Sequence, residues 1–523
     1  MTDSYAPHAA IFKGLPGLAE IDAQIAAMTE KADRRAIMLT DEGTNDKAPV
    51  DRLMRSLYVW AIVNKCSDIH ISGRGMRNHP QIYVNIRTPG GFRNFRLRYD
   101  KPDAATRWEG KLFDLTGTPQ GATTPEITST RFELELPEHF ARMHGLKLFD
   151  DEFTYNVDVR VEYKKTYNGF AFITRLLDPQ RVPKLHDLRL PFALLKAILT
   201  AVNLPSGLIL TTGPTGSGKT TLQNAMLAIR NDGSCAIDTI EDPVEIALRG
   251  DGPIKQVQIG GNITFARALR SVVRSDPDII LIGEIRDLET LDIALKASAT
   301  GHLVLATLHT NSSSEAITRM LDMAPQDDRA NYAYRIASQL KLVLAQRLLN
   351  QYAGDAQVRT LSGGEREWLH ANGVDLGREI KEVVVESGSR PIGKVPLVEA
   401  IVMTPGIQRC VRSTHVDISE IYKAACDQPQ FEPLAVGGVR AVQTHGATLQ
   451  EAMAVLEGNM DAQSHPSLRV RLANEHGLSF QGVSDAIDAH ARAVDRGETA
   501  ELRTFVEKAK LELITATIEQ EAA

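Results

Sequence analysis

A chain of 523 residues is long enough for about three domains of usual size, and its 43% hydrophobic and 24% charged residues are typical of a soluble globular protein. The formal net charge of −7 argues against a surface that binds nucleic acid generally, although a local basic patch is still allowed. No apolar run approaches the roughly 18 residues of a membrane span, so we expect no transmembrane segment.

The N-terminal third predicts an extension followed by an α+β domain. Residues 1–48 are weakly patterned and form the predicted extension. A helix pattern then runs over 49–64, and alternating strands are predicted over 81–87, 92–99, 156–163 and 169–176. The turn Tyr167-Asn168-Gly169 between the last two strands is a strong hairpin signal. We therefore predict an α+β domain over 49–178 and a linker over 179–190, where Pro179 and Pro183 lie.

The character changes at residue 191 to strands that alternate with helices, which is the pattern of a parallel α/β sheet. The predicted strands are 207–212, 235–240, 254–259, 278–282 and 302–308. The predicted helices are 192–203, 220–230, 265–274, 288–300, 313–321 and 334–349. These elements define a core domain over 191–350.

The C-terminal region is mixed but mainly helical. Over 351–462 we predict a strand at 382–386 and helices at 406–413 and 448–457. The tail, 463–523, carries two amphipathic helix patterns. Their apolar faces should pack on this protein or on a neighbouring subunit; a membrane surface suits them less, because their charges are mixed in sign.

A glycine-rich loop follows the apolar strand 207–212 and precedes the helix 220–230. The order of strand, glycine loop, Lys-Thr and helix is that of a phosphate-binding loop, in which backbone N–H groups and the helix N-terminus surround the phosphates. Lys219 is placed to reach the β- and γ-phosphates, and the Thr220 hydroxyl to bind Mg²⁺. The predicted ATP-binding residues are Gly213, Pro214, Thr215, Gly216, Ser217, Gly218, Lys219, Thr220 and Thr221.

Three further polar segments fall near the ends of predicted strands, where ligands bind in such sheets. Glu241, Asp242 and Glu245 could hold Mg²⁺ or its water, although by themselves they are better explained as an ordinary acidic loop. Gly283 stands where a strand-end aspartate is usual, and Glu284 follows it about 60 residues after the phosphate loop, so Glu284 is predicted to orient and polarise the attacking water. His302 and His309 flank one strand beside hydroxyl and amide groups and suit a γ-phosphate sensor; their spacing does not suggest zinc.

These segments together resemble the secretion ATPases of type II secretion and type IV pilus systems. The family has a phosphate loop, an "Asp box", a strand ending in Gly-Glu and a "His box" in this order. The resemblance runs from about 50 to 460. It is carried by Cys66-Ser67-Asp68-Ile69-His70, by 239–245, by 268–287, by 297–311 and by Gln346-Arg347-Leu348-Leu349.

The resemblance implies a RecA-like core, a PAS-like N-terminal domain, and a homo-hexameric ATP-driven motor that assembles or retracts a pilus or drives a pseudopilus. It implies ATP and Mg²⁺ as ligands, with Glu284 as the catalytic glutamate, Glu241, Asp242 and Glu245 as the Asp box, and His302 and His309 as the His box. Arg160 and Arg175 match arginines that the family places against ATP phosphates. The motor would be cytoplasmic, peripheral at the inner membrane, and bound to a platform protein there.

Two departures bear on this resemblance. Many members carry a four-cysteine zinc module after the Gln-Arg-Leu segment, but 350–388 contains no cysteine, so we expect no zinc site. Phe170 stands where the family usually has a glutamate. These features suit a divergent subfamily such as the type IVb pilus motors of conjugative plasmids.

Three rival interpretations remain to be weighed. Leu361-Ser362-Gly363-Gly364-Glu365 mimics the signature of ABC-type ATPases, but it follows Glu284 instead of preceding it, so we interpret it as a glycine-containing turn. A hexameric nucleic-acid motor or conjugative DNA-transfer ATPase is the main alternative; the acidic net charge argues against stable nucleic-acid binding. A non-catalytic scaffold is disfavoured by the intact Lys219, Thr220 and Glu284.

Overall fold

The computed structural model describes residues 37–39, 49–74, 81–88, 91–99, 104–116, 127–143, 146, 154–177, 183–248, 252–260, 263–386, 389, 391–456, 467–476, 478–498 and 501–522. The chain divides into two compact units, Met1–Arg181 and Val182–Ala523. The boundary falls within the linker predicted over 179–190, of which 179–182 lie outside the described residues, as does most of the extension predicted over 1–48.

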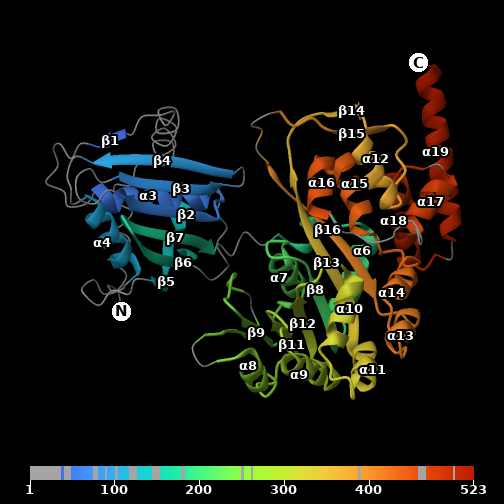
Figure 1. Ribbon diagram of the computed structural model, residues 1–523, viewed down its shortest axis with the longest axis horizontal. Coiled ribbons are helices and arrows are strands. Elements are labelled where there is room, and N and C mark those ends of the chain that lie inside the picture. Colours follow the sequence, from blue (N-terminus) through green and yellow to red (C-terminus); the bar gives the residue numbers. More distant parts are fainter. Residues whose placement is uncertain are drawn as a thin grey trace. The chain divides into compact units, whose positions relative to one another are not determined.

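The first unit is a seven-stranded sheet with helices packed on it (Figure 1). The strands run in the order β1-β4-β3-β2-β7-β6-β5, and every neighbouring pair is antiparallel except β1 and β4. Their bounds are β1 Ile37–Leu39, β2 Asp68–Arg74, β3 Gln81–Thr88, β4 Gly91–Tyr99, β5 Ile127–Pro137, β6 Thr154–Thr166 and β7 Gly169–Leu177. The helices are α3 Pro49–Val63, α4 Ala104–Thr116 and α5 Glu138–Met143.

One face of this sheet is buried, because alternate strand residues point to it. Trp60 of α3 and Trp108 of α4 pack with Ile71, Val84 and Phe172 in the core. The other face carries polar side chains, as the period of two in β3 and β7 requires. The hairpin predicted at Tyr167–Gly169 is present, with Thr166 opposite Gly169.

The second unit is built on another seven-stranded sheet, in the order β10-β9-β11-β12-β8-β13-β16. All neighbouring strands are parallel except β13 and β16. The strands are β8 Gly207–Thr212, β9 Ile237–Glu241, β10 Ile254–Gln258, β11 Ile279–Ile282, β12 Leu303–Leu308, β13 Leu340–Gln351 and β16 Gly393–Val402. A separate two-stranded sheet pairs β14 Ala356–Thr360 with β15 Glu379–Val383.

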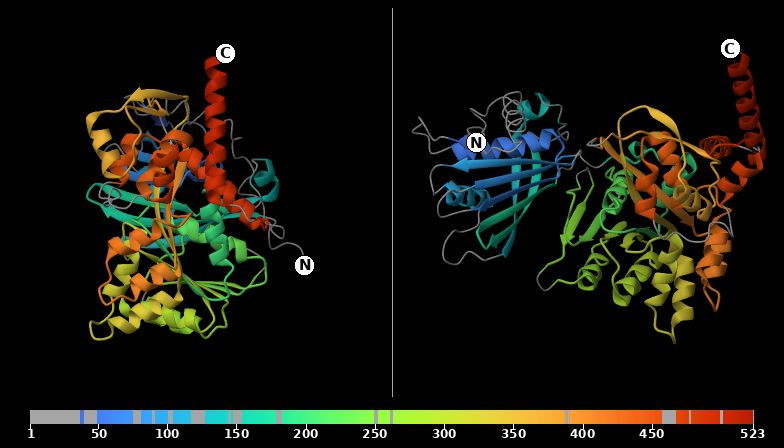
Figure 2. Two further views of the ribbon diagram at one scale, coloured as in Figure 1. Left: turned by 90° about the vertical axis from the view of Figure 1, so that its right-hand side faces the viewer. Right: turned by 45° about the horizontal axis from the view of Figure 1, so that its top comes forward.

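Helices cover both faces of the large sheet (Figures 1 and 2). On one face α6 Phe192–Val202 and α7 Lys219–Arg230 pack on Ile209, Leu281 and Leu305. On the other, the packing partners include Leu208, Ile280 and Val304. That second layer contains α8 Phe265–Val272, α9 Leu288–Ala299, α10 Ser313–Asp322, α11 Arg329–Gln339, α13 Pro405–Val411 and α14 Ile418–Ala425.

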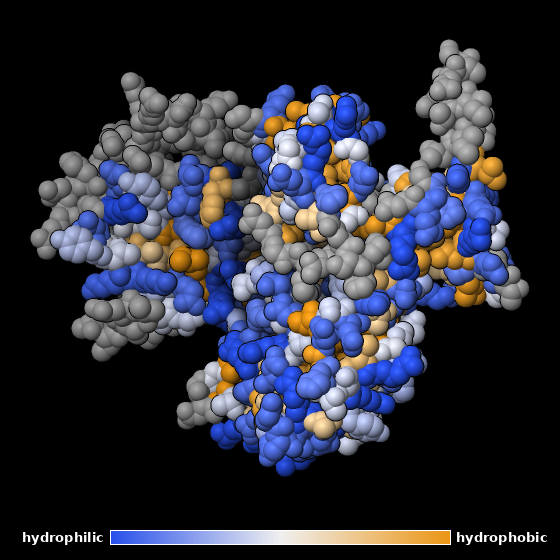
Figure 3. Space-filling view, turned by 45° about the vertical axis from the view of Figure 1, so that its right-hand side comes forward, coloured by the Kyte–Doolittle hydropathy of each residue, from blue (hydrophilic) through white to orange (hydrophobic). Residues whose placement is uncertain are grey.

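A third hydrophobic cluster joins the C-terminal helices to one end of β13 and β16, through Leu349, Val395 and Leu397. These helices are α12 Gly363–Ala371, α15 Leu434–His445, α16 Leu449–Leu456, α17 Leu468–His476, α18 Phe480–Asp495 and α19 Leu502–Ala522. A short 3₁₀ helix, Leu185–Leu188, precedes α6. On the face shown in Figure 3, hydrophilic side chains cover most of the described surface. Among the helices of the described residues, none is both long and apolar enough to cross a bilayer.

Two sequence predictions are wrong. The helix predicted over 334–349 ends at Gln339, and Leu340–Gln351 form strand β13. Both faces of β13 are covered, because Val343 packs in the core on one side of the sheet and Leu344 in the core on the other. The apolar run 342–345 therefore has no alternation that would separate a strand from a helix. The supposed turn at Leu361–Glu365 is the start of α12, where Ser362 and Glu365 form a capping box.

Candidate active site

The strand register brings the ends of five strands to one edge of the large sheet. Thr212 of β8 lies opposite Leu308 of β12 and Ala345 of β13. Ala306 of β12 lies opposite Ile282 of β11, and Ile282 lies opposite Ile240 of β9. The segments that follow these strands, including the glycine loop, the Asp box, Glu284 and His309, must therefore meet at this edge.

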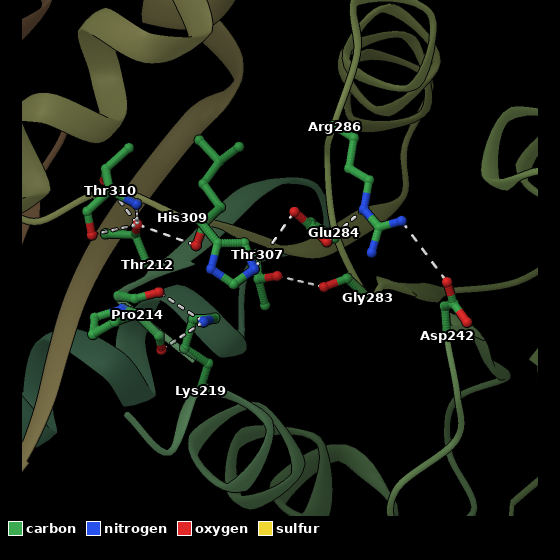
Figure 4. Close-up of polar contacts among 12 residues, drawn as sticks. Thr212, Pro214, Lys219, Asp242, Gly283, Glu284, Arg286, Thr307, His309 and Thr310 are labelled. Carbon is green, nitrogen blue, oxygen red and sulfur yellow. Dashed lines mark hydrogen bonds and ion pairs between the residues drawn. The ribbon is translucent and has the colours of Figure 1, made fainter. Parts of the chain in front are cut away.

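The glycine loop connects β8 to α7 and turns sharply at Gly218. Gly218 has φ = 87°, and a Cβ added there would lie 2.7 Å from Nε2 of Gln346, so only glycine fits without strain. Lys219 Nζ donates to the carbonyl oxygens of Gly213 (2.7 Å) and Pro214 (3.1 Å) (Figure 4). The pKa of Lys219 is lowered, chiefly by burial. The charge of Glu284 opposes this shift, and the charge of Arg347 adds to it.

The loop has the groups that a polyphosphate requires. The Ser217 side chain is buried, and its hydroxyl has no hydrogen-bond partner in the described structure. Thr220 and Thr221 lie half-buried in the first turn of α7, beside the N-terminus of that helix. An unmatched buried hydroxyl, a lysine ammonium and a helix N-terminus fit an anionic ligand accompanied by Mg²⁺.

Glu284 lies just past β11, between a histidine and an arginine (Figure 4). His309 Nε2 is 3.5 Å from its Oε1, and Arg286 Nε donates to its Oε2 at 2.6 Å. Arg286 Nη1 lies 3.8 Å from Asp242 Oδ2, so this arginine connects Glu284 to the Asp box. The carboxylate of Glu284 is thus hydrogen-bonded through Oε2, while its Oε1 faces the His309 imidazole.

Threonine hydroxyls fix the ends of the strands around Glu284. The Thr307 hydroxyl of β12 donates to the carbonyl oxygen of Gly283. The backbone N–H of Thr310 donates to Thr212 Oγ1 at 2.9 Å, and the two hydroxyl oxygens are 2.7 Å apart. These bonds tie the segment of His309 to β8 and to the residue before Glu284 (Figure 4).

The three acidic residues of the Asp box have different surroundings. Glu241 is buried, and its Oε1 accepts from Thr239 Oγ1 (2.7 Å) and Gln256 Nε2 (3.1 Å). Burial raises the pKa of Glu241. Asp242 faces Arg286, and Glu245 is half-buried with its charge close enough to act on Lys219. These two hydrogen bonds tie Glu241 to its own strand and to β10, so its side chain helps to fix the start of this loop on the sheet.

The two histidines lie at opposite ends of β12. His302 precedes the strand, and its Nδ1 is 3.0 Å from the carbonyl oxygen of Ala297. His309 follows the strand and reaches Glu284. Six residues of strand separate them, about 20 Å, so the structure brings only His309 to the glycine loop.

Arg160 and Arg175 belong to the first unit, where they lie opposite each other on β6 and β7. Arg175 Nε donates to Asp68 Oδ1 at 3.1 Å, and Arg160 Nη2 donates to Glu162 Oε1 at 3.3 Å. Arg131 of β5 lies opposite Arg160 in turn. The polar face of this sheet therefore carries neighbouring arginines.

Sequence reasoning did not single out Arg286, Gln256, Thr307 or Thr310. The available signal for Arg286 was its place two residues after Glu284, since alternate residues of an extended segment point the same way. Gln256 could not have been found in this manner, because its contact with Glu241 depends on the pairing of β10 with β9.

A parallel sheet flanked by helices, with a glycine loop after β8 and a glutamate after a neighbouring strand, defines a phosphate-loop nucleoside triphosphatase of RecA-like fold. Within that class the chain belongs to the family described as "Type II/IV secretion system protein", which matches residues 150–454. The predicted fold class and family are confirmed.

Several relatives have sequences similar to this one. Type II secretion system protein HxcR of Pseudomonas aeruginosa is 36% identical over 328 residues, covering 61% of this chain and 62% of HxcR. Type II secretion system protein E of Xanthomonas campestris pv. campestris is 31% identical over 456 residues, covering 83% and 72%. Type IV pilus assembly ATPase PilB of Acinetobacter baylyi is 32% identical over 419 residues, covering 78% and 66%. The chain thus spans about three fifths of HxcR and up to 72% of these relatives.

Solved structures of similar fold include the ATPase DotB and the pilus retraction motor PilT. The ATPase DotB of Legionella pneumophila superposes with a TM-score of 0.55 at 20% identity, covering 81% of this chain and 100% of DotB. The pilus retraction motor PilT, solved with bound ADP, superposes with a TM-score of 0.53 at 24% identity, covering 77% and 96%.

Proposed function

We propose that this protein hydrolyses ATP and is the homo-hexameric motor that assembles or retracts a type IV pilus or drives a type II secretion pseudopilus. The observation that carries the proposal is the meeting of Lys219, Glu284 and His309 at one edge of the sheet. Membership of the secretion family supports the choice of machine. On this proposal the motor works in the cytoplasm against a platform protein of the inner membrane.

The chain's own residues would divide the work as follows. The Lys219 ammonium donates to the Gly213 and Pro214 carbonyl oxygens in this structure. With a nucleotide bound, it would neutralise charge on the phosphate oxygens. The Thr220 hydroxyl would hold Mg²⁺, which supplies charge stabilisation at the phosphates. Glu284 would orient water, and the hydrogen bond from Arg286, with His309 facing the other oxygen, would fix the direction of that carboxylate. By the family resemblance, Arg160 and Arg175 would contact phosphate oxygens.

A steady-state ATPase assay tests the chemistry. Lys219→Ala should abolish hydrolysis together with tight nucleotide binding, whereas Glu284→Gln should abolish hydrolysis and retain ATP binding. Glu367→Gln is the matched control, because Glu367 is exposed on α12 in the same unit. Hydrolysis by Glu284→Gln at the parent rate would refute the assignment.

The machine and the assembly need separate measurements. Light scattering with ATP should give the mass of a hexamer. Membrane vesicles that contain the platform protein should stimulate the ATPase, whereas stimulation by DNA alone would favour a nucleic-acid motor. Deleting the gene and scoring pili, DNA transfer and secreted protein would identify the process served.

A further inference from the structure

Arg347 of β13 is a buried cation beside the glycine loop, and the proposed mechanism assigns it no role. Only 7% of its surface is exposed. A Cβ added to Gly213 would lie 2.5 Å from the carbonyl oxygen of Gln346 and 3.3 Å from Arg347 Nη1. The end of β13 therefore lies directly against the first glycine of the loop.

The guanidinium of Arg347 spans from β13 to the segment that carries His309. Its Nη1 donates to the carbonyl oxygen of Gln346 at 3.0 Å. Its Nη2 donates both to the carbonyl oxygen of Asn311 (2.9 Å) and to Asn311 Oδ1 (3.2 Å). Asn311 lies two residues beyond His309, so a planar arginine fork fixes the course of the chain as it leaves that histidine.

Two carboxylates support the same segment from its far side. Glu315 Oε2 accepts from the backbone N–H of Asn311 at 2.7 Å. Glu399 of β16, which is 3% exposed, accepts through Oε1 from the N–H of Ser313 at 3.0 Å and from its hydroxyl. Burial lowers the pKa of Arg347, and the charges of Glu399 and Glu315 oppose that shift. Within the described part of the chain no carboxylate forms a direct ion pair with this cation, and its N–H groups bond to Asn311 and Gln346.

We propose that Arg347 is a positioning residue that holds the His309 segment in register with the phosphate loop, and thereby holds His309 against Glu284. The inference rests on the proposed ATPase function. All of the hydrogen bonds given above for Arg347 go to oxygens of Gln346 and Asn311, which adjoin the glycine loop and His309. Its charge also acts on Lys219.

The primary test is Arg347→Lys in the full-length protein. Lysine keeps the charge but is a point donor without the planar fork, so it does not hold Asn311 in the same way. We expect kcat to fall at least tenfold, with the KM for ATP and the Kd for ADP within twofold of the parent values. The matched control is Arg335→Lys, because Arg335 likewise bonds one residue twice, at Asp292 Oδ1 (2.8 Å) and its carbonyl oxygen (3.3 Å). Arg335→Lys should keep the parent kcat.

A second variant separates positioning from general packing. Asn311 is exposed, so Asn311→Ala should fold, and it removes the carboxamide whose Oδ1 accepts from Arg347. We expect a loss of about threefold in kcat. The kcat of the double variant should be no more than twofold below that of Arg347→Lys alone, since both substitutions break the same Arg347–Asn311 contact. Losses that multiply in the double variant would overturn the inference. If Arg347→Lys does not fold, a parent kcat in Asn311→Ala overturns it equally.

A spectroscopic measurement adds a readout that does not depend on turnover. In the nucleotide-free protein, the imidazole NMR signal of His309 should shift in Arg347→Lys, whereas that of His302, at the other end of β12, should not. An unmoved His309 signal would contradict the proposal. A parent protein without ATPase activity would refute the proposed function; an active parent with an unaffected Arg347→Lys variant would refute only this inference.

Discussion

The tail of the chain supplies a helix cap to the core domain, and removing that cap gives a quantitative prediction. Asp488 of α18 is buried, and its two oxygens accept from the backbone N–H groups of Phe192 (2.9 Å) and Ala193 (3.0 Å). These are the first two residues of α6, whose own N-cap, Pro191, makes no side-chain cap. A carboxylate at this position satisfies two donors and interacts favourably with the helix dipole.

Asp488→Ala should destabilise the second unit by about 2 kcal/mol, because a lost cap costs about 1 kcal/mol and the loss of the charge from a buried helix N-terminus costs a similar amount. With an unfolding entropy of about 2.1 cal/mol/K per residue over Val182–Ala523, this lowers Tm by about 3 °C. Asp488→Asn keeps one acceptor and should lose about half as much.

Differential scanning calorimetry of the full chain measures this effect. Asp485→Ala is the matched control, since Asp485 is exposed one turn earlier on α18 and should cost less than about 0.5 kcal/mol. Hydrogen exchange of the 192–196 amides should quicken in Asp488→Ala alone. An unchanged Tm with unchanged exchange would show that α18 does not cap α6, and the docking of the tail inferred from Asp488 would be wrong.

Three other variants probe the site and the C-terminal module. Arg286→Gln removes the donor at Glu284 Oε2 and should lower kcat by about 3- to 10-fold with an unchanged KM. The control is Arg274→Gln, because Arg274 is exposed on the surface. An unchanged kcat in Arg286→Gln would show that the ion pair does not contribute to catalysis. Gly218→Ala should weaken binding of fluorescent ADP far more than Gly216→Ala, because a Cβ meets Gln346 at Gly218 and open space at Gly216; equal losses would contradict this. Hydrogen bonds from Arg359 lower the pKa of Glu365 to about 2, so its stabilisation, about 3 kcal/mol, is present above about pH 4.5 and is lost as the pH falls toward 2. Between pH 6 and 2.5, the free energy of unfolding measured by denaturation should fall less steeply in Glu365→Gln than in the parent. Parallel pH dependences of the two proteins would exclude this contribution.

The parts of the fold that depend on local pattern were predictable. The strand 207–212 has the bounds of β8, since a short apolar run before a glycine loop leaves few alternatives. The alternation of strands and helices predicted the parallel sheet, and the strand ends then placed Glu284 at the edge shared with Lys219. What followed from this order was the edge of the sheet, not the contacts made there.

Contacts between segments that are distant in the chain could not be predicted from the sequence. Asp488 meets Phe192 across 296 positions in the chain, and neither residue has a pattern that names the other. The pairing of Arg286 with Glu284 depends on side-chain direction after β11, and the bond from Gln256 to Glu241 depends on strand pairing. Burial and register, which decide these contacts, are properties of the folded chain.

The mistaken helix over 334–349 also concealed a site residue. On a helix, Gln346 and Arg347 would lie on different sides of a cylinder with no fixed relation to the phosphate loop. As part of β13 they come immediately after Ala345, which lies opposite Thr212, the last residue before Gly213. The strand assignment alone therefore brings the carbonyl of Gln346 and the guanidinium of Arg347 to the edge where the loop begins. A strand buried on both faces has no alternation of apolar and polar residues by which its sequence could be recognised. The position of the residues at its end is therefore known only when its neighbours in the sheet are known.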